Sequence, residues 1–270
     1  MNIKIIGNNL VLEDAEHINI PLCLDCGQAF RWRETEDGLW QGIANGKFLS
    51  LKQEENKITF FNTTKEDFDT IWSKYFDLNR DYKKIISSYN EENLIIACKS
   101  YPGIRILKQD EWEAICSFII SANNNIPRIK GIIERLCESF GDKIDGGYTF
   151  PPPEKLAVLD VEDLAVIRSG FRAKYIIDAA RKISSGEVDL EKTKTMDFED
   201  AKNELLKIKG VGEKVAQCAL LYGFGRMEAF PVDVWVKRIV AELYPNGLPE
   251  CIKGTEGIAQ QYLFHWRRNL

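Results

Sequence analysis

A lysine and an aspartate in the C-terminal part of the sequence could form a catalytic pair. Lys214 follows the turn Gly210-Val211-Gly212, and Asp233 lies nineteen residues further on. The first turn of a helix disfavours a positive charge, so an amine at Lys214 is favoured in its neutral, nucleophilic form. A neutral amine can form a Schiff base, and a carboxylate nearby would stabilise the positive charge that develops on the carbon under attack.

Each member of this pair also has an ordinary structural explanation. Lys214 alone could be a surface lysine that reaches a phosphate. Asp233 precedes an apolar-periodic run that starts at Val236, as a helix N-cap would, and capping aspartates are usually only structural. The two residues together are far more specific than either one alone.

Residues 205–222 predict two helices joined by a tight turn, a helix-hairpin-helix element. Gly210 and Gly212 leave the backbone N–H groups of the turn unobstructed, and apolar residues flank the turn on both sides. Such N–H groups at a helix start bind phosphate without preference for any base. A Gly-x-Gly turn can also be only an economical connection, and the flanking apolar residues are what favour DNA binding here.

The charge of the chain neither demands nor excludes a nucleic-acid partner. The net charge is −5, whereas phosphate neutralisation needs basic residues. Residues 168–182 nevertheless hold five Lys or Arg against the single Asp178. A dispersed acidic surface with local basic patches is compatible with DNA contact.

The composition argues against metal, disulfide and membrane chemistry. Seven cysteines are scattered along the chain, and Cys23 and Cys26 have zinc-like spacing without a second pair nearby. An iron–sulfur cluster would need four closely organised cysteines, and the C-terminal region offers only Cys251. The first ten residues resemble neither a signal peptide nor an anchor, and no apolar run reaches transmembrane length. We therefore expect a soluble, intracellular protein with no metal and no cofactor.

The secondary-structure signals change along the chain, which predicts an α+β fold. Residues 1–98 are expected to form an N-terminal domain with an antiparallel β-sheet and helices, and residues 99–270 an all-α domain. Strands are expected at Asn2–Ile6, Ala29–Arg33, Leu39–Ile43, Lys47–Leu51 and Ile58–Asn62. Helices are expected near 112–120, 126–140, 154–167, 172–184, 198–208, 213–222, 233–244 and 255–266, with Asn125 as the cap of the second.

Four separated motifs, in order, resemble the 8-oxoguanine DNA glycosylase/lyase family of helix-hairpin-helix glycosylases. They are the hairpin with its lysine and Pro231-Val232-Asp233, and the segments Gly27–Trp32, Ser121–Ile126 and Gly170–Tyr175. The resemblance runs from about Leu22 to Phe264 and is to the compact bacterial members. It implies a TBP-like N-terminal sheet domain and a helical glycosylase domain.

The resemblance implies a flipped-out base and a covalent mechanism. Lys214 would attack C1′ of the damaged nucleoside with help from Asp233, and β-elimination would then nick the strand. The carbonyl of Gly27 would accept a hydrogen bond from the N7–H that 8-oxoguanine has and guanine lacks. A single hydrogen bond to a buried acceptor can discriminate between two bases that are otherwise alike. Phe264 and Cys218 would sandwich the base, and Gln260 would read its Watson–Crick edge.

Further residues would contact the duplex, again by resemblance. Asn123, Arg128 and Arg172 would attend the orphaned cytosine, and Phe171 would fill the gap in the stack. The turn Gly210-Val211-Gly212 would contact phosphate. Without the family context, each of these residues fits a core, loop or cap position.

Two positions depart from the family pattern. Trp235 stands where many relatives have a phosphate-contacting histidine, so it would contact DNA differently or offer a stacking surface. Lys209 stands where a proline often opens the hairpin.

The expected partner is double-stranded DNA containing oxidised guanine. It would be bound by a monomer without an obligate protein partner, in the nucleoid-containing cytoplasm of a prokaryotic cell.

Three other functions share parts of this pattern. A monofunctional glycosylase for alkylated bases would share the hairpin and Asp233 but would not need Lys214. A thymine-glycol-type endonuclease would keep the lysine but would usually carry a four-cysteine cluster. In a non-catalytic DNA-binding module, Lys214 would be only a contact and Asp233 only a cap.

Overall fold

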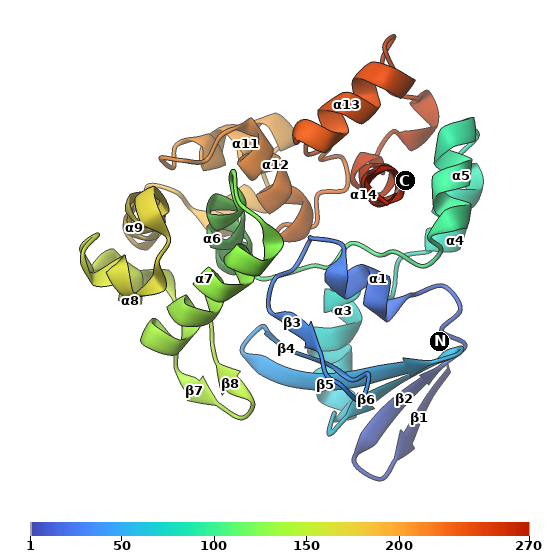
Figure 1. Ribbon diagram of the computed structural model, residues 1–270, viewed down its shortest axis with the longest axis horizontal. Helices are drawn as coiled ribbons and strands as arrows, with labels where there is room; N and C mark the ends of the chain where they lie inside the picture. Colours follow the sequence, from blue (N-terminus) through green and yellow to red (C-terminus); the bar gives the residue numbers. More distant parts are fainter. Residues whose placement is uncertain (1, 270) are drawn as a thin grey trace. The chain divides into compact units, whose positions relative to one another are not determined.

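The computed structural model describes residues 2–269 and separates into two compact units, whose elements are labelled in Figure 1. The first unit comprises Met1–Gln41, Leu49–Lys108 and Met227–Leu270, and the second comprises Gly42–Phe48 and Gln109–Arg226. The first unit therefore takes three segments of the chain, two from its N-terminal part and one from its C-terminal part.

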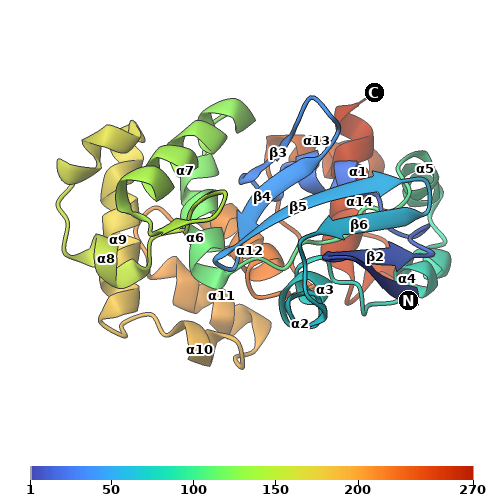
Figure 2. The same ribbon diagram turned by 90° about the horizontal axis from the view of Figure 1, so that it is seen from below.

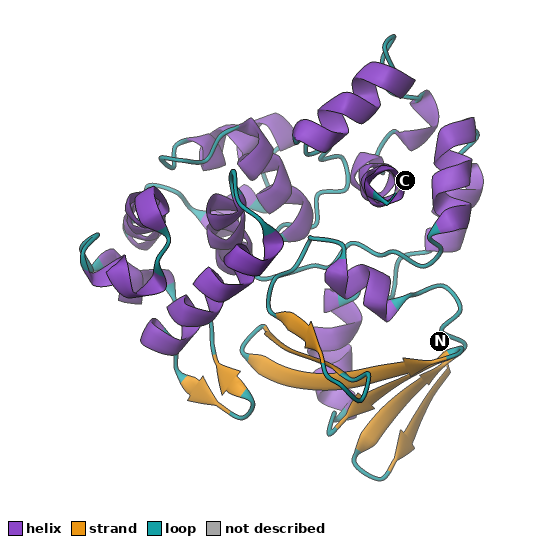
Figure 3. Cartoon of the chain, in the orientation of Figure 1, coloured by secondary structure: helices purple, strands orange, loops and turns teal. Residues whose placement is uncertain are grey.

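The first unit is built on a six-stranded sheet with strand order β1-β2-β6-β5-β4-β3. Figure 2 labels β2 to β6 of this sheet, and Figure 1 also labels β1. The strands of the sheet are β1 Asn2–Ile6, β2 Asn9–Glu13, β3 Trp32–Glu34, β4 Trp40–Ala44, β5 Lys47–Glu54 and β6 Lys57–Phe61. The pairs β1–β2, β2–β6 and β5–β6 are antiparallel. Apart from the short hairpin β7 (Lys143–Ile144) and β8 (Gly147–Tyr148), the described residues outside this sheet are helix and loop (Figure 3).

One face of the sheet is buried under a layer of aromatic side chains. Alternate residues point to the same face of a strand, and Leu49 and Leu51 of β5 are fully buried. Phe60 of β6 packs edge-on against Phe68, with ring centroids 5.2 Å apart, at the start of a π-helical turn. The same segment supplies Trp72, Tyr75 and Phe76. Edge-to-face contacts of this kind add to the apolar area that the rings bury.

Helices complete the first unit. They are α1 Ile20–Asp25, α2 Lys65–Asp67, α3 Ser73–Tyr75, α4 Tyr82–Ser88, α5 Glu92–Ser100, α13 Val234–Leu243 and α14 Glu256–Arg268. The C-terminal helix α14 packs on α5 and α13. Tyr244, which follows α13, donates to Glu91 Oε2 at 2.7 Å, and Glu91 also caps α5. The last 44 residues are thus tied to the N-terminal part, although the boundary expected at 98/99 puts them in the helical domain.

A buried glutamine holds together the loop after α1. Gln28 is fully buried, and its Nε2 donates to the carbonyls of Cys23 and Arg105 at 3.0 and 2.8 Å. Its Oε1 accepts from the N–H of Leu107 at 2.9 Å. Burial raises the pKa of the Cys23 thiol to about 11 and that of Cys26 to about 12. Both thiols are protonated at neutral pH and pack in the core.

The second unit is helical. Its helices are α6 Glu111–Ser121, α7 Ile126–Phe140, α8 Pro153–Ala157, α9 Ala173–Ser184, α10 Leu190–Thr193, α11 Phe198–Leu206 and α12 Glu213–Tyr222. Helix α12 packs on α6 and α11, and α9 packs on α8. Two 3₁₀ turns, Asp163–Ile167 and Gly170–Arg172, lie before α9. In the range 154–167, expected as one helix, α8 ends at Ala157 and a 3₁₀ turn follows.

The sequence predictions of fold class and of most elements are confirmed. The α+β class, β1, α7 and α12 agree with the expected bounds, and Asn125 caps α7 by accepting from the N–H of Arg128 at 3.0 Å. Strand β2 and the β7–β8 hairpin were not predicted. No helix among residues 2–269 is both long and apolar enough to cross a membrane.

We predict that Gln28→Leu destabilises the protein. The substitution leaves two buried carbonyls and one buried N–H without their partner, which costs about 3 kcal/mol or more. Urea unfolding of the two proteins measures the difference. Asn90→Ala, which removes an exposed amide, serves as the control and should change the free energy of unfolding by less than about 0.5 kcal/mol. A Gln28→Leu protein as stable as the control would contradict this role.

Candidate functional site

The first turn of α12 is open. Its N-cap residue is Gly212, in an extended conformation, and no described side chain caps it. The first backbone N–H groups of a helix have no partner within the helix, and their dipoles favour an anion at that end. The start of α12 is therefore open to an anion such as a phosphate, and the phosphate contact expected from the sequence stays a prediction.

The two glycines of the turn are required for different reasons. Gly210 has φ +85°, and a Cβ there would meet the ring of Tyr175 at 2.4 Å. Gly212 has φ −98°, and nothing lies within 4 Å of the position of its Cβ. Gly210 is thus needed by the fold, whereas Gly212 keeps the space in front of the helix start clear. Val211 between them is buried.

Helix α9 anchors the entry to the turn. The N–H of Lys209 donates to Asp178 Oδ2 at 2.8 Å, and Lys182 Nζ donates to the carbonyl of Lys207 just after α11. A lysine at the C-terminal end of a helix satisfies a carbonyl that has no partner in the helix. These contacts fix where α11 ends and hence where α12 begins.

Lys214 lies in the first turn of α12, and its side chain is half-buried. Its Nζ is 3.4 Å from the Oγ of Ser121 and 5.3 Å from the centre of the Phe118 ring. Both residues belong to the last turns of α6. The amine is therefore held at the C-terminal end of α6 rather than extended into solvent.

The residues after Ser121 form a loop that a buried arginine secures. Arg172 is only 3% exposed. Its guanidinium donates to the carbonyl of Ala122 at 2.5 and 3.2 Å and to that of Asn123 at 2.9 Å. Asn123 has φ +50°, a conformation that asparagine adopts more readily than most residues.

The other proposed duplex contacts of this unit lie beside that loop. Phe171 is 58% exposed, and its ring lies 4.5 Å from the Arg172 guanidinium. Arg128, in the first turn of α7, is exposed. Burial and the neighbouring charge of Arg128 lower the pKa of Arg172. Asn123, Arg128, Phe171 and Arg172 thus gather near Ser121, which contacts Lys214.

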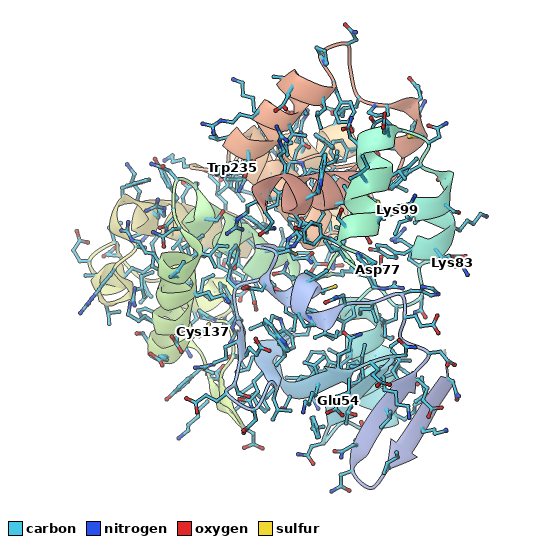
Figure 4. All side chains as sticks on the ribbon, turned by 45° about the vertical axis from the view of Figure 1, so that its right-hand side comes forward. Glu54, Asp77, Lys83, Lys99, Cys137 and Trp235 are labelled. Atoms are coloured by element: carbon cyan, nitrogen blue, oxygen red, sulfur yellow. The ribbon has the colours of Figure 1, made fainter. Side chains whose placement is uncertain are left out.

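In the first unit, Asp233 is the N-cap of α13. Its Oδ1 accepts from the N–H of Val236 at 2.7 Å, as the sequence predicted. Trp235, labelled in Figure 4, is 47% exposed on the first turn of α13, and Arg238 lies 5.4 Å from its ring centre. An exposed indole beside a guanidinium offers an apolar, cationic surface.

Two of the predicted base-reading residues share one face of α14. Gln260 and Phe264 are four residues apart, so their side chains lie on the same side of the helix. Gln260 is 5% exposed, and its Nε2 donates to the carbonyl of Pro231 at 3.3 Å. Its Oε1 is buried and has no hydrogen-bond partner. Phe264 is partly exposed.

The loop that contains Gly27 is tied to the same helix. Gln261 Nε2, next to Gln260, donates to the carbonyl of Cys26 at 3.4 Å. Gly27 has φ +87°, a conformation that favours glycine. The next residue, Gln28, is anchored by the hydrogen bond from its side chain to the carbonyl of Arg105. The backbone of Gly27 is thus held on both sides. Cys218, in the second unit, is buried one helical turn after Lys214.

Sequence reasoning assigned no role to Ser121 or Phe118. Ser121 belongs to the motif Ser121–Ile126, but only a three-dimensional contact distinguishes it from any other helix-ending serine. Phe118 fits the apolar face of its helix and is buried. Among residues 2–269, no group of three or more metal-ligating side chains comes together.

The two halves of the chain match two models of DNA-repair domains. Residues 10–115 match the N-terminal domain of 8-oxoguanine DNA glycosylase, and residues 116–250 match the HhH-GPD superfamily of base excision DNA repair proteins. The antiparallel six-stranded sheet followed by a helical domain fits these two domain models.

Related proteins narrow the class. The N-glycosylase/DNA lyase of Saccharomyces cerevisiae is 33% identical over 257 residues, which cover 82% of this chain and 67% of the yeast protein. A probable N-glycosylase/DNA lyase of Methanothermobacter thermautotrophicus is 36% identical, and the match spans 62% of its length.

Solved structures agree over nearly the whole chain. The 8-oxoguanine glycosylase/lyase of Clostridium acetobutylicum, in complex with double-stranded DNA, is 36% identical with a TM-score of 0.92, and the match covers 100% of this chain and 98% of that one. MBOgg1, in complex with a low-affinity DNA ligand, is 43% identical with a TM-score of 0.92, covering 99% and 98%.

The chain belongs to the 8-oxoguanine DNA glycosylase/lyase family, within the HhH-GPD superfamily of base excision DNA repair proteins. It is accordingly an enzyme with DNA N-glycosylase and lyase activity. Its size matches that of the bacterial Clostridium protein, which confirms the expected resemblance to compact members.

We predict opposite outcomes for the two glycines of the turn. Gly210→Ala should lower the free energy of unfolding by about 2 kcal/mol or more, because its φ and the Tyr175 ring both oppose a side chain. Gly212→Ala should cost at most about 1 kcal/mol but should weaken duplex binding, because its methyl group occupies the space before the helix start. Thermal unfolding and fluorescence anisotropy with duplex DNA measure the two effects. Full duplex affinity in Gly212→Ala would argue against phosphate contact here.

Proposed function

We propose that this enzyme removes 8-oxoguanine from double-stranded DNA through a Schiff base on Lys214 and then cleaves the strand by β-elimination. One observation carries the proposal. The Lys214 amine lies at the open first turn of α12, held by a hydroxyl and a ring face of α6. A phosphate at that turn and a nucleophile two residues later would meet the same nucleotide.

The proposed reaction starts from Lys214 with its amine in the neutral form. Lys214 Nζ forms a bond to C1′ of the lesion nucleoside as the N9–C1′ bond breaks, and the departing base takes the electron pair and a proton. Asp233, by resemblance, is the carboxylate that stabilises the positive charge on the sugar. Ring opening gives a Schiff base, and loss of a proton from C2′ expels the 3′ phosphate.

Most of the residues expected to read the base lie in the first unit. The buried Oε1 of Gln260 has no partner, and an acceptor in that state favours a ligand that brings an N–H group. A base edge does so. By resemblance, Gly27 and Phe264 of the first unit and Cys218 of the second would each contact the base, and the anchored backbone of Gly27 would present its carbonyl to the N7–H of 8-oxoguanine.

Contacts to the opposite strand would come from the loop after α6. Asn123 and Arg128 would address the orphaned cytosine, and the exposed Phe171 would fill the gap left in the stack. The structure leaves Arg172 few donors for a base, because its guanidinium is already bonded to loop carbonyls. Trp235 would contact DNA as a stacking surface.

We place the enzyme, as a monomer, at the nucleoid of a prokaryotic cytoplasm, without an obligate protein partner and away from membranes.

We predict that Lys214→Gln lowers the single-turnover rate of base excision by more than about a thousandfold, on the order of losses that follow removal of a nucleophile. Borohydride should trap the wild-type enzyme on a duplex that contains 8-oxoguanine opposite cytosine and should not trap the variant. Duplex affinity should stay within about threefold. Lys192→Gln, on the exposed side of α10, is the matched control and should be trapped like the wild type. Residual excision at the wild-type rate would remove Lys214 from the mechanism.

We predict that Gln260→Leu slows excision of 8-oxoguanine by about tenfold or more, because a bond to the base edge is lost at a buried position. Trapping at a preformed abasic site should change far less, since no base is present to be read. Gly27→Ala is a weaker test, because alanine at φ +87° would strain the loop itself. Equal losses on both substrates would assign Gln260 to the chemistry or the fold instead.

A second lesion class has one specific observation in its favour. DNA-3-methyladenine glycosylase of Bacillus subtilis is 31% identical over 167 residues, which cover 59% of this chain. The same excision assay on a duplex containing 3-methyladenine distinguishes the two lesions. Faster excision of the alkylated base would favour the alternative.

A further inference from the structure

Ser121 is placed as an acceptor for the Lys214 amine. It is the last residue of α6, and its Oγ donates to the carbonyl of Phe118 at 2.9 Å. A hydroxyl has one proton and two lone pairs. Because that proton is already bound, the Oγ meets Lys214 Nζ, 3.4 Å away, as an acceptor. The contact is long, as catalytic hydrogen bonds often are before substrate binds.

The Phe118 ring limits the other side of the amine. Its centre is 5.3 Å from Lys214 Nζ, and the ring stacks on Tyr222 with centroids 5.2 Å apart and planes at 19°. Phe118 and Tyr222 are both buried, so the ring has little freedom to turn. The Phe118 ring packs against one side of the amine, whereas the Ser121 hydroxyl accepts a hydrogen bond from it and thereby orients it.

Ser121 is itself held from the following residues. Arg172 bonds the carbonyls of Ala122 and Asn123, which directly follow it. Hydrogen bonds from a charged donor to the last carbonyls of a helix are stronger than neutral ones. The end of α6 is therefore fixed at the point where it meets the amine.

We propose that Ser121 is a positioning residue for Lys214, orienting its amine for attack on C1′. This inference rests on the proposed role of Lys214 as the nucleophile. A reacting group displaced by about 1 Å can lose rate on the order of a hundredfold, and loss of a single neutral hydrogen bond corresponds to about tenfold. Ser121 acts through Lys214 and takes no part in bond making.

The test uses the full-length enzyme and a duplex with a preformed abasic site, which removes base recognition from the measurement. Ser121→Ala should lower the single-turnover rate of borohydride trapping by about tenfold at saturating enzyme. Ser121→Thr, which keeps the hydroxyl, should restore the rate to within about threefold. The dissociation constant for the duplex should change by less than about twofold, because positioning affects the chemical step.

Ser87→Ala is the matched control. Ser87 lies in the last turn of α4, and its Oγ donates to the carbonyl of Lys84 at 2.9 Å, the same helix-ending bond that Ser121 makes. This variant should lose as little stability as Ser121→Ala and keep the wild-type rate. If Ser121→Ala does not fold, Ser121→Cys replaces it, because a thiol is a poor acceptor of similar shape.

The outcomes separate the two levels of inference. A wild-type enzyme that borohydride does not trap would overturn the proposed function itself. A trapped wild type with an equally fast Ser121→Ala or Ser121→Cys would overturn only the role of Ser121. A Ser121→Thr enzyme as slow as Ser121→Ala would also overturn it, since shape and not the hydroxyl would then matter.

Discussion

The open first turn of α12 is the constraint on which the second unit depends. Many helices satisfy a first N–H group with a capping side chain, and Asp233 and Asn125 do so elsewhere in this chain. Gly212 at the start of α12 cannot. The surrounding contacts keep this start fixed although it has no cap: Asp178 and Lys182 hold the turn from α9, and Tyr175 fills the space beside Gly210. The missing cap is thus built into a rigid frame, which is what an anion site needs.

The elements with local signals were predictable from the sequence. The bounds of α7 follow from a capping asparagine, a proline in the first turn and a glycine at the end, and α12 follows from its glycines. Asp233 as a cap is a local signal of the same kind. Strand β2 was missed because its buried residues, Leu10, Val11 and Leu12, run continuously rather than alternating.

Features that depend on distant contacts were not predictable in this way. Pairing of β7 with β8 involves only two residues in each strand, too few for a periodic signal. The grouping of α13 and α14 with the first unit depends on bonds such as Tyr244 to Glu91, which join residues 153 positions apart. Arg172 is the clearest case at the site. Its sequence neighbours indicate a surface residue, yet it is buried against the loop carbonyls. Local sequence patterns predict where helices and strands lie, whereas long-range hydrogen bonds determine which side chains stabilise the fold.

The chain has a net charge of −5, and the proposed phosphate contact at the hairpin has to be compatible with it. The lysines near the turn are largely neutralised: Lys182 lies 3.8 Å from Asp178, Lys202 is 2.9 Å from Glu213, and Lys207 is 2.7 Å from Glu204. Even Lys209, whose side chain is 76% exposed, lies 3.6 Å from Asp178. A lysine paired with a carboxylate at this distance contributes little net attraction toward a further anion, because the two charges largely cancel. The backbone N–H groups at the start of α12 carry no such partner, so they, rather than the lysines, are the main positive feature of the turn. A nucleotide backbone bound through fixed N–H groups would be positioned closely, because these groups cannot change conformation as a lysine side chain does. The Lys214 amine lies two residues past Gly212, on the same helical turn that would bind the phosphate in the proposed function.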